Sequence, residues 1–254
     1  MALPHVVFKP LSLRRETEII SNFLLEGGPE WSKYVTRCHP QLRRALTLAT
    51  KRERLAFVRT YVDEYRTRHA KRLKNRQDAF ERDWQKVEQR FFTRLADILE
   101  TDWPKRRSHI TASVSINPIC PRFLDEWSFT ISMNAERSRA REIIMHECVH
   151  FLYFKKWTEI YPNADRRTFE SPHIVWELSE LIAPIILNDP HINAMLRGRA
   201  QFYSYHRRVR IEQMTAPAYF AKRYRQRKNF DAFLRTSYQI IKRHKRAFRK
   251  AQNA

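Results

Sequence analysis

The residues with the clearest chemical potential lie in the run His146-Glu147-Cys148-Val149-His150. In a helix, residues four positions apart share a face, so the imidazoles of His146 and His150 can both reach one metal ion. The carboxylate of Glu147 is expected to point into the same space, where it can accept a proton. Together these groups form the smallest set that supports zinc-assisted hydrolysis.

The run is predicted to lie within a longer helix. Asn134 can cap the first turn, Lys155 and Lys156 lie near the other end, and residues 135–161 contain neither Gly nor Pro. Apolar side chains cover nearly every side, so the helix is expected in a core. Imidazoles and a carboxylate are costly there without partners, and a metal ion would satisfy them. The competing interpretation is a pair of core histidines that bond to the backbone.

The chain has three cysteines, Cys38, Cys120 and Cys148, and they show no Cys-x-x-Cys spacing. Reduced thiols are the simplest interpretation. Cys148 lies between the two histidines, but on a helix it points about 160–200° away from them. We therefore expect Cys148 to pack in the core and not to bind metal.

Two strands are expected directly before this helix and a second apolar helix after it. Residues 110–116 and 128–133 alternate apolar with polar side chains, which indicates two strands. Residues 171–188 read as a helix that is apolar on nearly all sides, in which Pro184 is expected to cause a kink or an end. Its two charged residues, Glu177 and Glu180, are one turn apart, and buried carboxylates need a cation or donors.

The N-terminal part is expected to be helical. No Gly or Pro occurs between Pro40 and Pro104, where apolar residues recur at helical spacing, so one or two long amphipathic helices are predicted. The apolar stripe weakens over residues 69–77, which form either a break or a solvent-exposed stretch. The cations there could form a basic arm for a partner or a solvated helical face. With only three glycines in 254 residues, the chain is predicted to be an α+β protein that is predominantly helical.

The positive charge is concentrated at the C-terminal end. The formal net charge is +22, and residues 197–254 contain seventeen Lys or Arg against Glu212 and Asp231. Such a surplus suggests a polyanionic partner, and a nucleic acid is the candidate. The interleaved aromatic residues could stack on bases, or they could dock the segment on the rest of the fold. An amphipathic basic helix is expected from Asn229.

Some classes of protein are not expected. No apolar run approaches the length of a membrane span, and the first residues lack the apolar core of a signal peptide. The default expectation is a soluble cytoplasmic protein.

From Ile110 to Asn188, the order strand, strand, His-Glu-x-x-His helix and glutamate helix resembles the gluzincin metallopeptidases. The closest layout is that of the small members called minigluzincins. The resemblance implies a zincin-like catalytic core at residues 105–196, with a small β-sheet, an active-site helix and a glutamate helix. Helical extensions at 1–104 and 197–254 would flank this core. The resemblance also implies a Zn²⁺ cofactor held by His146 and His150, with Glu147 as the general base.

The third ligand implied by the resemblance is a glutamate of the second helix. Glu180 follows the small polar residue Ser179, much as the family's glutamates often follow Asn, and its distance from His150 suits the longer-spaced members. Glu177 is the alternative because it lies nearer the main apolar stripe. Three further histidines are weaker candidates: His173, His109 and His191.

The function expected from these features is a zinc-dependent metalloendopeptidase that acts on peptides or proteins. The resemblance suggests that the free edge of the strand at 128–133 pairs with substrate, and that the segment after Asp189 keeps the enzyme latent, as in a zymogen. Two alternatives remain open. One is a basic protein associated with nucleic acid, or a protease that acts on nucleic-acid-bound substrates. The other is a catalytically silent zinc scaffold.

Overall fold

The computed structural model describes residues 3–196 and 198–252. The chain folds into two compact units. The sheet unit consists of His5–Lys86 and His109–Ile144, and the helical unit consists mainly of Val87–Ser108 and the described chain from residue 145 onward. Neither unit is continuous along the chain, because residues remote in sequence pack together. The helix that carries the two histidines starts in the sheet unit and continues into the helical unit.

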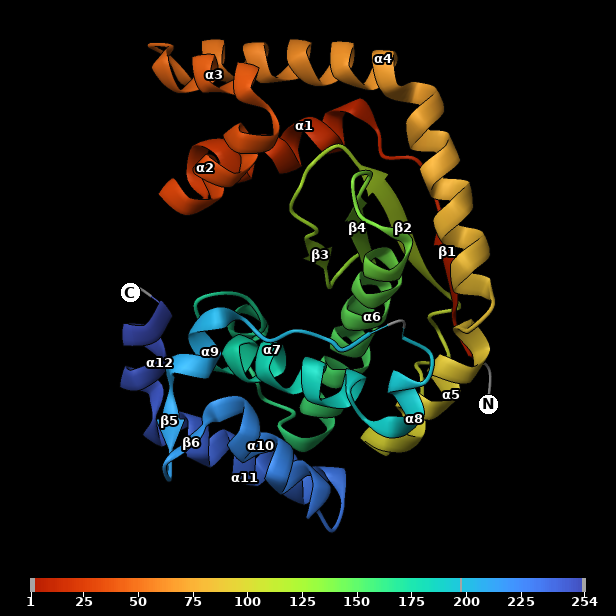
Figure 1. Ribbon diagram of the computed structural model, residues 1–254, viewed down its shortest axis with the longest axis vertical. Coiled ribbons are helices and arrows are strands. Elements are labelled where there is room, and N and C mark those ends of the chain that lie inside the picture. The colour runs from red at the N-terminus through yellow and green to blue at the C-terminus, as the bar shows by residue number, and fades with distance from the viewer. Residues whose placement is uncertain (1–2, 197, 253–254) are drawn as a thin grey trace. The chain divides into compact units, whose positions relative to one another are not determined.

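The sheet unit is built on a four-stranded mixed sheet in the order β1-β2-β4-β3 (Figure 1). The pairs β1–β2 and β2–β4 are parallel, with Val6 opposite Ile110 and Ala112 opposite Phe129, and β3 is antiparallel to β4. The two predicted strands are confirmed as β2 and β4, whereas the short strands β1 and β3 are additions to the prediction. The strands are β1 His5–Phe8, β2 His109–Ser115, β3 Arg122–Phe123 and β4 Ser128–Ser132.

The edge of β4 that the resemblance leaves free for substrate is partly paired. Phe123 and Arg122 of β3 lie opposite Ser128 and Phe129, and the Thr130 amide donates to the Pro121 carbonyl at 3.0 Å. The loop between β2 and β4, which contains Pro118 and Pro121, therefore returns along this edge. A substrate backbone could not pair with these residues of β4 unless the loop moved away.

The long N-terminal helix does not break where its apolar stripe weakens. Helix α4 covers residues 69–77 without interruption, and Thr50 and Glu53 form a capping box at its start. Arg76 donates to the carbonyls of Met133 and Ala135, and Arg72 donates to the Asn134 side chain at 2.9 Å. Two of the clustered cations thus hold the connection after β4. The helices of this part are α1 Leu13–Ser21, α2 Pro29–Cys38, α3 Arg43–Thr47 and α4 Lys51–Gln85.

Helix α6, Arg137–Ile160, carries the two histidines and contains no break. Asn134 does not cap it, because the helix begins three residues later and the Asn134 side chain accepts from Arg72. Within the sheet unit, Arg141 of α6 forms a buried bidentate pair with Asp83 of α4 at 2.6 and 2.9 Å. Such charge-assisted double bonds fix orientation as well as position. The start of α6 is therefore anchored to α4.

In the helical unit, helix α7 is buried on nearly every side, and α10 and α11 pack against it (Figure 1). Pro184 lies inside α7, and the helix continues to Leu187. The other elements are α5 Glu88–Leu99, a 3-10 turn at Arg166–Phe169, α7 Ile174–Leu187, α8 Pro190–Asn193, α9 Ser204–Arg208, β5 Arg210–Ile211, β6 Met214–Thr215, α10 Ala216–Arg225, α11 Phe230–Arg243 and α12 Lys245–Gln252.

The basic C-terminal segment is an integral part of this unit. Asn229 caps α11, and the predicted apolar face is buried at five positions of this helix. Docking of the aromatic residues is confirmed for most of them: Tyr219, Phe220, Tyr224, Phe230, Phe233 and Phe248 are buried. The chain is thus predominantly helical with a small mixed sheet, as the α+β prediction states. Among the described residues, no helix has both the length and the apolar character needed to cross a membrane.

Candidate metal centre

The two histidines of α6 face each other across one helical turn, as their spacing predicts. Their Nε2 atoms are 3.0 Å apart, and the ring planes meet at 77°. The side chain of His150 is fully buried, whereas that of His146 keeps 24% of its surface exposed. The pair is thus held by the core on one side and is accessible on the other.

Glu180 of α7 completes a group of three donor residues. Its Oε2 lies 3.2 Å from His146 Nε2 and its Oε1 lies 3.4 Å from His150 Nε2. In a tetrahedral zinc site with bonds of about 2.0–2.2 Å, neighbouring donor atoms are about 3.3–3.5 Å apart. The observed separations of 3.0–3.4 Å are close to these edges. A buried group of His146, His150 and Glu180 could therefore hold a metal ion.

The charge state of Glu180 also suits a ligand. Burial raises the pKa of its carboxyl group, but the positive charges and hydrogen bonds of His150 and His146 outweigh burial, so the pKa lies well below its usual value. In the metal-free group Glu180 is therefore anionic at neutral pH, and a bound metal ion would replace the positive charge of the imidazole protons. Two imidazoles and one carboxylate are a donor set that zinc readily accepts.

Glu177, the alternative third ligand, has other partners. Its Oε1 accepts a hydrogen bond from His206 Nε2 at 2.6 Å, and its Oε2 accepts one from the Tyr205 hydroxyl at 3.2 Å. Both donors lie on α9. The buried carboxylate of Glu177 is therefore satisfied by side chains of the C-terminal segment, and it is not part of the group around His146 and His150.

The remaining candidates lie elsewhere. His173 is an exposed residue at the start of α7, and its Nδ1 lies 2.9 Å from the Glu170 carbonyl. His109 begins β2 in the sheet unit, and His191 lies on α8. None of the three belongs to a group with metal-ligand geometry among the residues that the structure describes.

Cys148 packs in the core, as its helical direction predicts. The side chain is fully buried. Burial, followed by the charges of Glu147 and Glu88, raises the pKa of the thiol well above its ordinary value. Because zinc binds the thiolate, a thiol that stays protonated is a poor ligand.

Glu147 is 7% exposed and adjoins His146 on α6. A carboxylate beside the donor group could serve as a proton acceptor, because burial limits competition from bulk water. The bonds from Tyr205 and His206 to Glu177, one turn from Glu180, are contacts that the sequence does not predict. Tyr205 stands among the interleaved aromatics of the tail, but nothing local indicates that α9 reaches α7.

The arrangement provides three donor residues, with an acidic residue next to one of them. That set is able to bind a divalent metal and to move a proton. No protein-family model, curated protein or solved structure matches this chain. The likeness to gluzincins therefore rests on the His-Glu-x-x-His run and on the glutamate that completes the donor group.

Proposed function

We propose that the chain is a zinc-dependent metallopeptidase, with the two histidines of α6 and Glu180 as ligands and Glu147 as general base. The proposal rests on the three donor residues, whose atoms lie 3.0–3.4 Å apart. Structural zinc sites usually have four protein ligands, whereas catalytic sites have three and an open position. The group has three donors among the described residues, which supports a catalytic role over a silent scaffold.

His146, His150 and Glu180 would hold the zinc ion, which would supply Lewis acidity to the scissile carbonyl and to an attacking water. Glu147 accepts the proton of the attacking water and delivers it to the leaving amine as the carbon–nitrogen bond breaks. Helices α6 and α7 hold the ligands in place, so little reorganisation is needed when substrate binds. The peptide bond as substrate comes from the resemblance to gluzincins, because the donor group alone would also suit other hydrolyses.

Tyr205 is our candidate for stabilising the negative charge that develops on the carbonyl oxygen. Burial, followed by the charge of Glu177, raises the pKa of its hydroxyl, and Glu180 contributes to the same shift. Tyr205 therefore stays neutral and acts as a hydrogen-bond donor, and its partner Glu177 lies one turn of α7 from the proposed ligand. In the proposed step, its hydroxyl leaves the Glu177 carboxylate and donates to the oxyanion.

Latency remains part of the proposal in a restricted form. Tyr205 and His206 of α9 bond to Glu177. Glu177 lies one turn of α7 from Glu180, so α9 contacts α7 close to the donor group. The segment that carries α9 also contributes buried aromatic side chains to the unit. A restraint on the site would thus be a built-in contact of the folded unit and not a detachable plug.

The proposal is tested by zinc analysis and by assays on casein and a peptide library. Glu147→Gln should retain about one zinc per chain and lose at least about a hundredfold in hydrolysis, because the proton acceptor is gone. Glu136→Gln, at an exposed position just before α6, is the matched control and should keep full activity. Equal activity of Glu147→Gln and the wild type would refute the base assignment. A zinc-loaded wild type without hydrolysis would identify a silent scaffold, and a folded chain that takes up no metal would end the proposal.

A further inference from the structure

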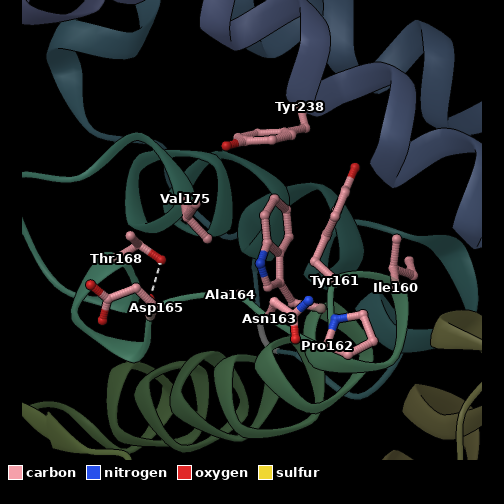
Figure 2. A pocket seen from close by; sticks show the side chains of 10 residues that line it. Ile160, Tyr161, Pro162, Asn163, Ala164, Asp165, Thr168, Val175 and Tyr238 are labelled. Carbon is pink, nitrogen blue, oxygen red and sulfur yellow. Dashed lines mark hydrogen bonds between the residues drawn. The ribbon is translucent and has the colours of Figure 1, made fainter.

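A second feature of the helical unit is a hollow of about 440 Å³ at the C-terminal end of α6. Its walls include Trp157, Tyr161 and Tyr238, and we call it the aromatic pocket. Figure 2 shows Tyr238 of α11 on one side, with Asp165 and Thr168 lying across the pocket from Tyr161. The volume lies within the range of roughly 300–1,000 Å³ that is typical of small-molecule sites.

The three aromatic rings contact one another at different angles. The Trp157 centroid lies 4.6 Å from that of Tyr161 and 4.9 Å from that of Tyr238, and the two tyrosine centroids are 5.6 Å apart. Trp157 is buried, but both tyrosines are partly exposed. Every other aromatic residue of α10 and α11 is buried. Tyr238 is therefore the aromatic residue of these two helices that can meet a ligand.

Cations of α11 flank the aromatic pocket. The Arg235 guanidinium lies 5.5 Å from the Tyr161 ring centroid, and the Lys242 ammonium lies 5.2 Å from that of Tyr238. Both side chains are exposed. Their positions place positive charge at the rim, where phosphate groups attached to a stacked base could lie.

The positive charge extends along the three last helices. Residues 216–252 contain twelve Lys or Arg and a single acid, Asp231, which is paired with Lys156. A second hollow of about 270 Å³, between α10 and α11, is lined by Arg223, Arg227 and Lys228. Helix α11 lines both hollows. A single nucleotide could neutralise only a small part of this charge, whereas a polymer could follow it.

We propose that the aromatic pocket binds a base of a single-stranded nucleic acid, stacked on Tyr161 or Tyr238. Arg235 and Lys242 pair with the adjoining phosphates, and the cations of α10–α12 neutralise the phosphates that follow. The polar groups of Asn163, Asp165 and Thr168 meet the edge of the base. A cationic ligand is disfavoured, because the positive charges of Arg235 and Lys242 beside the pocket would repel it. This site is separate from the proposed metal centre and does not depend on it.

The test is fluorescence anisotropy with the full-length chain and labelled oligo(dT) and oligo(U) of about 15 nucleotides, the upper end of the usual site sizes. Tyr238→Leu and Tyr161→Leu should each raise Kd about 5- to 150-fold, because one stacking contact is lost. Arg235→Gln with Lys242→Gln should reduce the slope of log K against log salt by about 1.4. The matched control is Arg14→Gln with Lys33→Gln, two exposed cations of the sheet unit, and its slope should stay near the wild-type value.

If a tyrosine variant fails to fold, the Arg235→Gln and Lys242→Gln variant still tests the proposal, because both side chains are exposed. Photocrosslinking of the wild type to the oligonucleotide should modify Tyr161 or Tyr238. Unchanged binding in folded tyrosine variants would overturn the proposal. So would a duplex that binds as tightly as the single strand, which would indicate charge alone. Displacement of the oligonucleotide by an equal concentration of uridine monophosphate would assign the pocket to free nucleotides, and preferential binding of a trimethyllysine peptide would assign it to cations.

Discussion

Two carboxylates of α7, one turn apart, have different partners and should respond differently to the same change. Glu180→Gln removes an anionic donor from the histidine pair, so we expect zinc to be lost or bound at least tenfold more weakly. Glu177→Gln removes an acceptor from Tyr205 and His206, so it should cost about 1–3 kcal/mol of unfolding free energy and leave zinc in place. Metal analysis and urea unfolding of both variants measure the difference. Zinc loss in Glu177→Gln alone would reverse the ligand assignment.

The role of Tyr205 can be separated from simple support of Glu177. Tyr205→Phe should lower kcat about 10²- to 10³-fold with little change in KM, because the lost donor acts only as charge develops on the substrate oxygen. His206→Gln is the matched control, since it alters the other donor to the same carboxylate. Zinc content should be unchanged in both. If the two variants lose kcat equally, Tyr205 acts only through Glu177.

At the scale of single residues, the sequence predicts those contacts that follow from spacing within one helix. His146 and His150 are one turn apart in any helix, so their proximity follows from the pattern. The preference for Glu180 over Glu177 uses only Ser179 and a distance along the chain. In the structure, Glu180 lies 3.2 and 3.4 Å from the two histidines, whereas Glu177 accepts hydrogen bonds from two donors of α9. No local pattern reveals that a segment almost thirty residues later bonds there.

At the scale of elements, His39 links three parts of the sheet unit. Its Nε2 lies 2.9 Å from the Ile116 carbonyl after β2, and its Nδ1 lies 2.8 Å from the hydroxyl of Tyr61 on α4. Burial lowers the pKa of His39 below its ordinary value, and burial raises that of Tyr61 to about 12. Neutral His39 therefore donates from Nε2 to the carbonyl and accepts the tyrosine hydroxyl at Nδ1. Protonation would remove that acceptor.

This arrangement gives the fold a defined pH dependence. The unfolded chain binds the proton of His39 more readily than the folded one, so the unfolding free energy should fall as pH drops below about 6.5. His39→Gln should remove the contribution of His39 to the slope of unfolding free energy against pH, which is at most about 1.4 kcal/mol per pH unit. Urea unfolding between about pH 7.5 and 5 measures the slope, and His191→Gln, at an exposed position of α8, is the control. An unchanged slope in His39→Gln would contradict the assignment.

Elements with a long periodic pattern are predictable, and short ones are not. Residues 110–116 and 128–133 alternate clearly, and both are strands. Strand β1 has four residues and β3 has two, too few for periodicity to identify them. The stretch at 69–77 is helical, and its Arg72 and Arg76 bond to the chain after β4, a tertiary contact that composition does not reveal.

At the scale of the whole molecule, the division into units depends on pairings that are remote in sequence. Strand β1 pairs with β2 about a hundred residues later, with His5 opposite His109. The C-terminal segment joins the unit of α7 through its buried aromatic side chains. Consecutive segments are the natural prediction when such pairings are unknown. The physical unit is set by which apolar faces meet.

The C-terminal segment should therefore be required for folding. Deletion of residues 197–254 removes Phe220, Phe230, Leu234 and Phe248 from the core and takes both donors from buried Glu177. Each lost core side chain costs about 2–5 kcal/mol, and domains have only about 5–15 kcal/mol in total. We expect the truncated chain to lose near-UV circular dichroism and amide protection in α6 and α7.

Deletion of residues 249–254 is the matched control, because it keeps Phe248, and none of its described residues, 249–252, is buried, so it should leave these signals nearly intact. The two deletions also decide how latency can be tested. If deletion of residues 197–254 unfolds the chain, activity is lost together with the fold, and the deletion cannot test latency. An increase in activity should then be sought in point variants of α9. A truncation that stays folded, binds zinc and cleaves faster than the full chain would show that the segment is a removable plug after all.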